Sequence, residues 1–240
     1  MNILITGTTS GIGLQLAKDY LKAGHTVYCC GRNDSILREL ASQYGARAAP
    51  LRFDVQSRHD CLLALSSVPE LDLVILNAGT CEYIDASNFD ASSFERVIRI
   101  NVIGISNCLE ALIPKLKAGS CLSMMGSSSS YLPLPRAEAY GASKAAIEYL
   151  AKTLAITLGK DGIHVSYISP GFVETPLTDL NDFPMPMRVD VEFASRQIRQ
   201  GLEKKDREIH FPKLFTVVLK ALSLLPFAWQ RFLLAKVLMS

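Results

Sequence analysis

Short apolar runs alternate with segments of helical length along almost the whole chain, and this rhythm limits the possible folds more than any other feature. The expected strands are Asn2–Ile5, Thr26–Cys30, Ala48–Phe53, Leu71–Leu76, Ser120–Met125, His164–Ile168 and a weaker one at Glu208–Phe211. Helical patterns fill the gaps at Gly13–Ala23, Ile36–Tyr44, Arg58–Ser66, Ser92–Leu116 and Ala139–Leu158. Because a strand–helix–strand repeat builds a parallel sheet with helices on both faces, we expect a doubly wound α/β fold with a mostly parallel, seven-stranded sheet.

The composition favours one large domain and argues against nucleic acid as a partner. The chain has 240 residues, of which 49% are hydrophobic and 20% are charged, and this suits a single well-filled core. The net charge is +2, and Lys and Arg are spread along the sequence without a basic stripe for a phosphate backbone.

The cysteines show neither CxxC spacing nor the density of a disulfide framework. They are Cys29, Cys30, Cys61, Cys81, Cys108 and Cys121. We therefore expect reduced, buried thiols, no structural metal and a cytoplasmic setting.

Neither end of the sequence predicts a targeting or membrane-spanning segment. The first apolar run meets Gly7 and polar residues at once, which leaves no room for the apolar region of a signal peptide. Near the other end, Leu214–Leu238 is rich in Leu, Phe and Val. Lys220, Pro226 and Arg231 interrupt it before about 20 apolar residues accumulate.

A glycine-rich turn joins the first strand to a helix, with the sequence Thr6-Gly7-Thr8-Thr9-Ser10-Gly11-Ile12-Gly13. Small residues let the backbone turn tightly and approach a pyrophosphate, whose charge then meets the exposed amides of the helix N-terminus. Such a turn can be purely structural, but at the start of a strand–helix series it favours a dinucleotide site. The candidate binding residues are Gly7, Thr9, Ser10, Gly11, Ile12 and Gly13.

The end of the second strand favours NADP(H) over NAD(H). In NAD enzymes an acidic side chain about 20 residues beyond the glycine turn binds the ribose 2′-hydroxyl, whereas a nearby Arg accommodates the 2′-phosphate of NADP. Here Gly31 stands at the acidic position and Arg32 follows it. A phosphate would therefore meet a cation and no carboxylate. Two alternatives stay open: Arg32 is a solvated charge, or nearby Asp34 allows NAD(H).

Tyr140 and Lys144 form a candidate acid–base pair. Their i, i+4 spacing places them on one face of a predicted helix. A ketone that gains a hydride needs a proton donor, and a nearby cation that lowers the tyrosine pKa from about 10 would let Tyr140 serve. The spacing alone can arise by chance, so its weight comes from its place after the fifth strand, near the crevice of an open α/β sheet.

These features together resemble the short-chain dehydrogenase/reductase family. The turn matches the family's T-G-x-x-x-G-[IL]-G motif, and Tyr140-x-x-x-Lys144 matches its Y-x-x-x-K motif. Ser127 stands thirteen residues before Tyr140, at the family's usual serine offset, within the run Ser127–Ser130. Asn101 resembles the family's Asn, which helps to hold a water chain to the active-site Lys. The alternatives are a turn serine and an exposed asparagine.

Further family landmarks follow in order, although each alone is more often structural. Asn77, Ala78 and Gly79 resemble the N-A-G motif after the fourth strand, and residues 170–175 resemble the P-G-x-V-x-T segment beside nicotinamide. The resemblance implies that Asp54 and Val55 contact adenine and that Val173 and Thr175 hold the carboxamide. The cofactor candidates from these segments are Asp54, Val55, Asn77, Ala78, Gly79, Pro170, Gly171, Val173 and Thr175.

The resemblance implies a Rossmann-like enzyme that moves a hydride between NADP(H) and a carbonyl or alcohol. Tyr140 would be the general acid and base, Ser127 would hold the substrate oxygen, and Lys144 would lower the tyrosine pKa and bond the nicotinamide ribose. Family members commonly associate through the helices that match 92–116 and 139–158, which implies a homodimer or homotetramer. Because a fold does not establish chemistry, two alternatives stay open: a nonenzymatic NADP-binding regulator and a membrane-surface protein.

The resemblance covers Met1 to about Pro176 well and is loose beyond it. We assign 1–212 to the catalytic domain, with a substrate lid at 177–196, and 213–240 to an apolar, helical tail. The lid side chains favour an apolar ketone, 3-oxoacyl or steroid-like substrate or form a satellite core; they are Leu177, Leu180, Phe183, Met185 and Met187. The tail could pack on the body or an oligomer partner, cover an apolar pocket, or contact a membrane surface with Lys220, Arg231 and Lys236 near headgroups.

Overall fold

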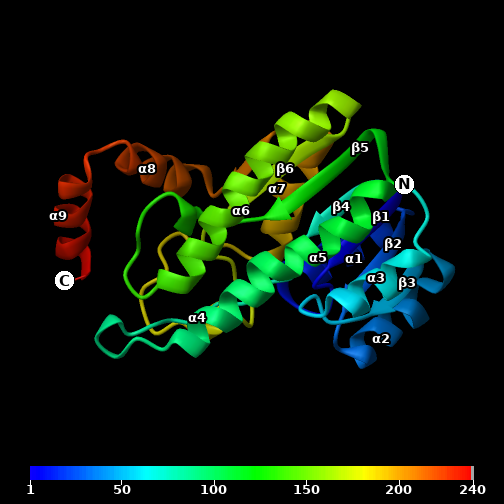
Figure 1. Ribbon diagram of the computed structural model, residues 1–240, viewed down its shortest axis with the longest axis horizontal. Coiled ribbons are helices and arrows are strands. Elements are labelled where there is room, and N and C mark those ends of the chain that lie inside the picture. The colour runs from blue at the N-terminus through cyan, green and yellow to red at the C-terminus, as the bar shows by residue number, and fades with distance from the viewer. Residues whose placement is uncertain (239–240) are drawn as a thin grey trace.

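A seven-stranded, wholly parallel sheet forms the centre of the computed structural model (Figure 1). The structure describes residues 1–238, and the side chains of all of these except Leu180 and 235–238. The strands are β1 Asn2–Thr6, β2 Thr26–Gly31, β3 Ala48–Arg52, β4 Leu71–Leu76, β5 Leu116–Met125, β6 His164–Pro170 and β7 Glu208–Phe211. Their order, β3-β2-β1-β4-β5-β6-β7, confirms the predicted doubly wound, Rossmann-like α/β fold.

Helices cover both faces of the sheet, and the strands contribute to a separate core on each side. One core includes side chains of α1 (Gly11–Lys22), α2 (Asp34–Tyr44) and α7 (Val191–Glu203). The other includes side chains of α3 (Arg58–Ser66), α5 (Gly104–Leu112) and α6 (Glu138–Thr157). In β1, Ile3 and Ile5 join the first core and Leu4 joins the second, as the alternating directions of strand side chains require.

Polar side chains define where several helices begin. The Asn33 side chain accepts hydrogen bonds from the backbone N–H groups of Ser35 and Ile36 at the start of α2. Ser57 and Asp190 cap α3 and α7 in the same way. Each cap satisfies a backbone donor that has no partner within the helix, so these local signals position the helix starts without tertiary contacts.

The region predicted as one long helix, 92–116, contains three parts. It begins as α4 (Ala91–Ile98), passes through a π-helical turn at Arg99–Ile103, and continues as α5. By length and composition, Ala91–Lys115 is the one helix among the described residues that could cross a membrane. It instead packs against α3 and α6 and supplies Ile105, Cys108, Leu109 and Leu112 to the core.

The strand order places a crevice at the carboxyl ends of β1 and β4. The chain leaves β1 toward β2 on one side, whereas β4 pairs with β1 on the other side. Open α/β sheets bind ligands at this switch point, because the loops that follow the two strands run in opposite directions. The loops after β1 and β4 begin at Gly7 and Asn77.

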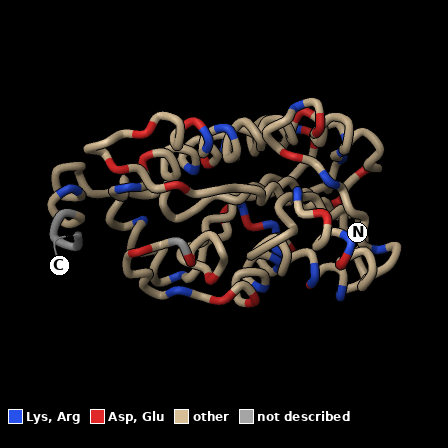
Figure 2. The backbone as a smooth tube through the Cα atoms, turned by 90° about the horizontal axis from the view of Figure 1, so that it is seen from below, with Lys and Arg blue, Asp and Glu red and all other residues tan. Residues whose placement is uncertain are grey.

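The segments beyond β6 depart from a simple βα repeat. Residues 177–190 form a loop with a short 3₁₀ turn at Thr178–Leu180, and 191–196 of the segment assigned to the lid are the first turns of α7. After β7, the tail forms α8 (Lys213–Ser223) and α9 (Phe227–Leu238). Figures 1 and 2 show these two helices at the end of the molecule opposite the N-terminus.

We expect Gly13→Ala to destabilise the protein. A Cβ at position 13 would lie 2.2 Å from the Gly7 carbonyl oxygen and 2.4 Å from Nδ2 of Asn77, so α1 would have to move away from the sheet. Such overpacking costs about 1–3 kcal/mol of unfolding free energy, which urea denaturation would measure. Gly159→Ala is the control, because no atom lies within 4 Å of its Cβ position. Equal stability of the two variants would contradict this packing argument.

Candidate active site

A cavity of about 320 Å³ lies over the carboxyl ends of the strands. The glycine turn after β1, the ends of β2, β3, β4 and β5, the start of α6 and the loop after β6 all contribute to its walls. The candidate residues that line it are Gly7, Thr9, Ser10, Gly11, Ile12, Arg32, Asp54, Val55, Asn77, Ala78, Gly79, Tyr140, Lys144, Pro170, Gly171, Val173 and Thr175. Gly13, Asn101 and Ser127 are the candidates outside this lining.

Asn77 holds the glycine turn against the end of β4. Its Nδ2 donates hydrogen bonds to the carbonyl oxygens of Thr6 (3.0 Å) and Gly7 (3.3 Å). The Thr6 hydroxyl accepts the backbone N–H groups of Asn77 and Ala78 in return. Gly7 has φ +73°, and a Cβ there would lie 2.9 Å from Nδ2 of Asn77. Both the backbone angle and the space therefore require glycine.

At one end of the cavity, the cation of Arg32 follows Gly31, which has no side chain. Nη1 of Arg32 lies 3.5 Å from Oδ2 of Asp54, and 71% of the Arg32 side chain is exposed, so this surface pair contributes little to stability and leaves the guanidinium accessible. A Cβ at Gly31 would lie 2.6 Å from Cγ2 of Thr9. An acidic side chain at position 31 would thus require Thr9 to move.

The Asp54–Val55 segment is anchored from α5 by two residues that sequence reasoning missed. Nδ2 of buried Asn107 donates to the Val55 carbonyl oxygen at 2.9 Å. A Cβ at Gly104 would lie 2.8 Å from Cγ2 of Val55, so glycine lets the two elements meet. No short motif marks these contacts, because their partners are about fifty residues apart in the chain.

Lys144 is a buried amine tied to the end of β5. It is 4% exposed, and its Nζ donates to the Met125 carbonyl oxygen at 2.9 Å. Nζ lies 5.5 Å from the centre of the Tyr140 ring. Burial lowers the pKa of Lys144 to about 8, although the nearby Cys81 thiol opposes this shift. The amine is therefore protonated mainly below that pH.

Burial raises the pKa of Tyr140 well above its usual value, and the Cys81 thiol acts in the same direction. A hydrogen bond with the Ser127 side chain opposes this effect without reversing it. The direction is opposite to the lowering expected from Lys144, because removal of the phenol from water outweighs the other influences. Tyr140 therefore keeps its proton at neutral pH, as a proton donor must.

Ser127 lies beside Tyr140, in a loop fixed by residues that the sequence did not single out. The Ser127 side chain accepts the backbone N–H of Ser129 at 3.1 Å. The hydroxyl of Tyr167, on β6, accepts the Ser127 backbone N–H at 3.3 Å and lies 3.1 Å from Oγ of Ser130. A Cβ at Gly126 would overlap the Tyr167 ring. Glycine and tyrosine together therefore position the serine.

Asn101 clamps two elements of the site together. It is fully buried, in the π-helical turn, and its Nδ2 donates to the Thr80 carbonyl oxygen and to the Ser143 hydroxyl, both at 2.9 Å. Its Oδ1 accepts the Thr80 backbone N–H at 2.8 Å. The asparagine side chain thus connects the loop after β4 to the helix that carries Tyr140 and Lys144.

The loop after β6 closes the cavity over the glycine turn. The Thr178 hydroxyl donates to the Val173 carbonyl oxygen at 2.6 Å and accepts the Thr175 backbone N–H at 3.0 Å. A Cβ at Gly11 would lie 3.1 Å from Cγ2 of Thr175, so this loop directly overlies the turn. Sequence reasoning missed Thr178, which also lines the cavity.

Aromatic side chains gather on the side of the lid loop. Phe183 packs edge to face on Tyr83 and on Phe172, with ring centres 5.4 and 6.1 Å apart. The Tyr83 hydroxyl donates to the side chain of Asn181 at 2.6 Å, and Arg136 lies over the Tyr83 ring. These contacts connect the lid to the loop that follows the Asn77–Gly79 segment. Phe172, Phe183 and Tyr83 thus form an aromatic wall, and Tyr83 lies electrostatically close to Tyr140.

The described residues bring together no group of three His, Cys, Asp or Glu side chains that could hold a metal ion. The thiols of Cys29, Cys30, Cys61, Cys108 and Cys121 are buried, and Cys81 is half-buried. Cys81 is also the thiol whose charge influences the pKa of both Tyr140 and Lys144.

The fold and the cavity define a class of protein: a Rossmann-like α/β protein with a glycine-rich turn and a Tyr–Lys pair at the switch point of its sheet. The sequence profile of the family described as short chain dehydrogenase matches residues 1–182. The chain therefore belongs to the short-chain dehydrogenase family of oxidoreductases.

Two curated relatives illustrate this membership. The chain is 30% identical over 232 residues to an uncharacterized oxidoreductase of Myxococcus xanthus, covering 93% of this chain and 92% of the relative. It is 31% identical over 181 residues to a 3-beta-hydroxysteroid dehydrogenase of Comamonas testosteroni, covering 72% of this chain and 71% of that enzyme.

Solved structures share the fold at lower sequence identity. A short chain dehydrogenase from Burkholderia cenocepacia J2315, in complex with NADP, superposes with a TM-score of 0.85 at 23% identity and covers 97% of each chain. A short-chain dehydrogenase from Sphingobium yanoikuyae, in complex with NADPH, gives a TM-score of 0.79 at 22% identity and covers 88% of each chain.

We expect Asn101→Ala to destabilise the protein, because it leaves the Thr80 backbone groups and the Ser143 hydroxyl without this partner. A buried polar group that loses its hydrogen bond costs about 1–3 kcal/mol, and thermal unfolding would reveal the loss. Exposed Asn88 supplies the control, Asn88→Ala. An Asn101→Ala variant as stable as the control would refute the clamp.

Proposed function

We propose that this protein is an NADP(H)-dependent short-chain reductase that transfers a hydride between nicotinamide and an apolar carbonyl or alcohol. The observation that carries the proposal is that Tyr140 and Lys144 line the same cavity as the glycine turn, with the Ser127 side chain hydrogen-bonded to Tyr140. A binding module would need the glycine turn, but it would not need a buried proton donor beside the same cavity.

The residues present fit a nicotinamide dinucleotide. Gly7, Gly11 and Gly13 occupy positions where a Cβ would meet the opposite wall or the adjoining backbone, so the turn keeps its amides open for phosphates at the start of α1. Exposed Arg32 can meet a 2′-phosphate, and Gly31 offers no carboxylate that would repel it. Asp34, which would have favoured NAD(H), pairs with Arg38 and does not line the cavity.

The protein residues supply the proton and hold the substrate oxygen. When bound, the cofactor supplies the hydride for carbonyl reduction. The hydroxyls of Ser127 and Tyr140 donate hydrogen bonds to the carbonyl oxygen, and the Tyr140 proton moves to that oxygen as it gains negative charge. Protonated Lys144 stabilises the tyrosinate that remains. Because burial raises the Tyr140 pKa, the phenol is protonated before the reaction and can supply this proton.

The surroundings of the catalytic group favour an apolar substrate. Phe172, Phe183 and Tyr83 form the aromatic wall beside it. Among the relatives, the steroid dehydrogenase of Comamonas testosteroni carries a name that indicates an apolar alcohol or ketone. We therefore infer a ketone, 3-oxoacyl or steroid-like molecule whose carbonyl reaches Tyr140 while its apolar part contacts the aromatic wall.

We also propose a cytoplasmic homodimer or homotetramer, as in the family. Large apolar side chains are exposed on the two helices that would pair: Ile103 (46%), Tyr149 (76%) and Ile156 (70%). Burial of such side chains between two copies would contribute to association.

Tyr140→Phe should abolish most turnover and spare cofactor binding. The variant lacks the proton that the substrate oxygen must gain, so kcat should fall by at least about 100-fold, in an assay of NADPH oxidation with a panel of apolar ketones. The phosphate contacts are untouched, so the fluorescence titration with NADPH should be unchanged. Tyr149→Phe, on the exposed face of the same helix, is the control. Undiminished turnover in Tyr140→Phe would exclude this tyrosine as the acid.

Arg32→Ala should weaken NADPH binding more than NADH binding. Removal of the cation that meets the 2′-phosphate should raise the Kd for NADPH about tenfold, with little change for NADH. Fluorescence titration with both cofactors measures this difference. Arg38→Ala is the control, since Arg38 pairs with Asp34. If both Kd values changed equally, Arg32 would not distinguish the two cofactors.

A further inference from the structure

The tail helix α8 turns polar side chains toward the body and leaves a row of apolar side chains exposed. Thr216, Lys220 and Ser223 are buried or half-buried on the side that contacts the body. The opposite side consists of exposed apolar residues at helical spacing: Leu214 (67%), Val217 (52%), Val218 (48%), Ala221, Leu224 (86%) and Leu225 (37%). A solvent-facing helix normally shows the reverse pattern, so this face has the character of an interaction surface.

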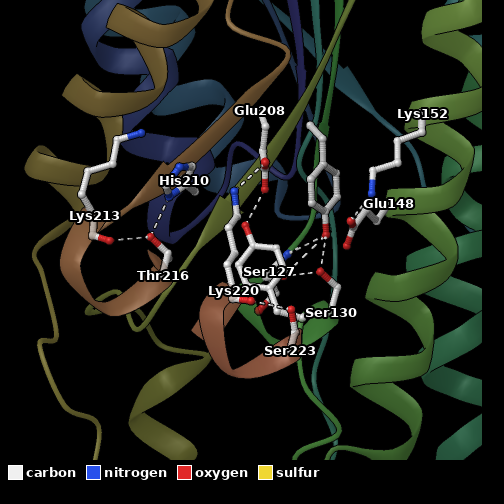
Figure 3. A network of polar contacts seen from close by, with 12 residues as sticks. Ser127, Ser130, Glu148, Lys152, Glu208, His210, Lys213, Thr216, Lys220 and Ser223 are labelled. Atoms are coloured by element: carbon white, nitrogen blue, oxygen red, sulfur yellow. Dashed lines mark hydrogen bonds and ion pairs between the residues drawn. The ribbon is translucent and has the colours of Figure 1, made fainter. Parts of the chain in front are cut away.

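A hydrogen-bonded network fixes this orientation (Figure 3). Nζ of Lys220 donates to one carboxylate oxygen of Glu208 at 2.6 Å, and the Tyr131 hydroxyl donates to the other at 2.6 Å. Although burial favours the neutral carboxyl, these hydrogen bonds lower the pKa of Glu208 below its ordinary value. His210 and Thr216 add a further contact at 2.7 Å. Lys220 and Thr216 thus contact Glu208 and His210 of β7, and the helix cannot turn its apolar face inward without breaking these contacts.

The second tail helix, α9, extends the apolar surface. Its exposed residues include Phe227 (66%), Trp229 (60%), Phe232 (51%) and Leu233 (36%). The side chain of Gln230 donates to the carbonyl oxygens of Ser223 and Leu225 and so ties α9 to the end of α8. Figure 1 shows α9 at the far end of the molecule, away from the sheet. The two helices together form the tail surface, defined by the apolar residues named for α8 and α9.

The charge of the tail matches an anionic surface. From Ile209 to Ser240 the sequence contains Lys213, Lys220, Arg231 and Lys236 but no Asp or Glu, and Figure 2 shows the two tail helices with blue segments and no red ones. Lys213 and Arg231 are exposed at the border of the apolar face. A second copy of the tail would bring like charges together without a carboxylate to pair with them, whereas anionic headgroups would neutralise them.

The helix lengths determine how such a surface would be used. Helices α8 and α9 have 11 and 12 residues, whereas a span of the bilayer core needs about 20. Apolar side chains bordered by Lys and Arg, with an exposed Trp, are typical of helices that lie in the plane of the membrane interface. The tail surface is therefore long enough to lie on a bilayer and too short to cross it.

We propose that the tail surface of α8 and α9 binds peripherally to a lipid bilayer that contains anionic headgroups. This inference goes beyond the proposed catalytic function and does not depend on it. The apolar side chains enter the boundary between headgroups and acyl chains, while Lys213 and Arg231 contact the lipid phosphates. Phe215 of α8 packs on Phe172 of the loop after β6, with ring centres 5.6 Å apart, so the bilayer would lie close to this loop.

Flotation of the full chain with vesicles tests this proposal. We expect the protein to float with vesicles of phosphatidylcholine mixed with phosphatidylglycerol, and much less with phosphatidylcholine alone. Val217→Glu and Trp229→Glu should each weaken binding to the mixed vesicles at least tenfold. Each substitution removes the contribution of one buried apolar side chain and adds a negative charge, which anionic headgroups repel. Lys213→Ser with Arg231→Ser should weaken it at least about fivefold.

The control is Leu63→Glu, because Leu63 (67% exposed) is at least as exposed as Val217 and Trp229 but lies on α3, away from the tail. It should bind vesicles as the original chain does, and thermal unfolding should show that every variant is folded. Failure of the original chain to float with the mixed vesicles would overturn the proposal. So would a loss in Leu63→Glu as large as that in Val217→Glu. Light scattering would also measure the mass of each variant in solution. If Val217→Glu converted an oligomer to monomers and left vesicle binding unchanged, the tail surface would instead bind a second copy of the chain.

Discussion

The close approach of α1 to the ends of β1 and β4 is the contact on which the rest of the site depends. Because position 13 has no Cβ, the first turn of the helix can lie against Gly7 and Asn77. Asn77 then holds the glycine turn by hydrogen bonds to its carbonyl oxygens, which leaves the amides at the start of α1 free for an anion. Thr175 closes over Gly11 from the opposite side. The cavity of about 320 Å³ follows from this one packing arrangement.

Burial acts on Tyr140 and Lys144 in the same physical sense. It disfavours the charged form of each, so the Tyr140 pKa rises and the Lys144 pKa falls to about 8. A negative charge on Tyr140 therefore requires a positive charge nearby. Protonated Lys144 would provide it when the Tyr140 proton moves to a substrate oxygen. The same low-dielectric surroundings strengthen the hydrogen bond between Tyr140 and Ser127 that would stabilise such a state.

The regular elements could be predicted because their signals are local: each expected strand overlaps an observed one, and the bounds of α3 agree fully. Between 191 and 203, charged residues alternate with apolar ones, so the sequence pattern did not reveal helix α7 and its buried apolar face. The first turns of this helix were therefore assigned to the lid. The π-helical turn at Asn101 depends on Thr80 and Ser143, which only the fold brings near. Likewise, no local pattern marks Tyr167, whose hydroxyl positions the serine loop from a neighbouring strand. Motifs thus predicted the groups at the cavity, whereas their supports required the tertiary structure.

The distribution of thiols has a practical consequence for labelling experiments. Five cysteines are buried, so their alkylation would report how often the interior opens and not how reactive each sulfur is. Cys81 differs, because it is half-buried and electrostatically close to Tyr140 and Lys144. Burial raises the pKa of the Cys81 thiol to about 11, so an alkylating reagent would act on it slowly, yet ahead of the five buried sulfurs of the folded protein. Mass spectrometry of the alkylated protein would thus distinguish folded molecules, labelled at Cys81 alone, from molecules whose interior has opened.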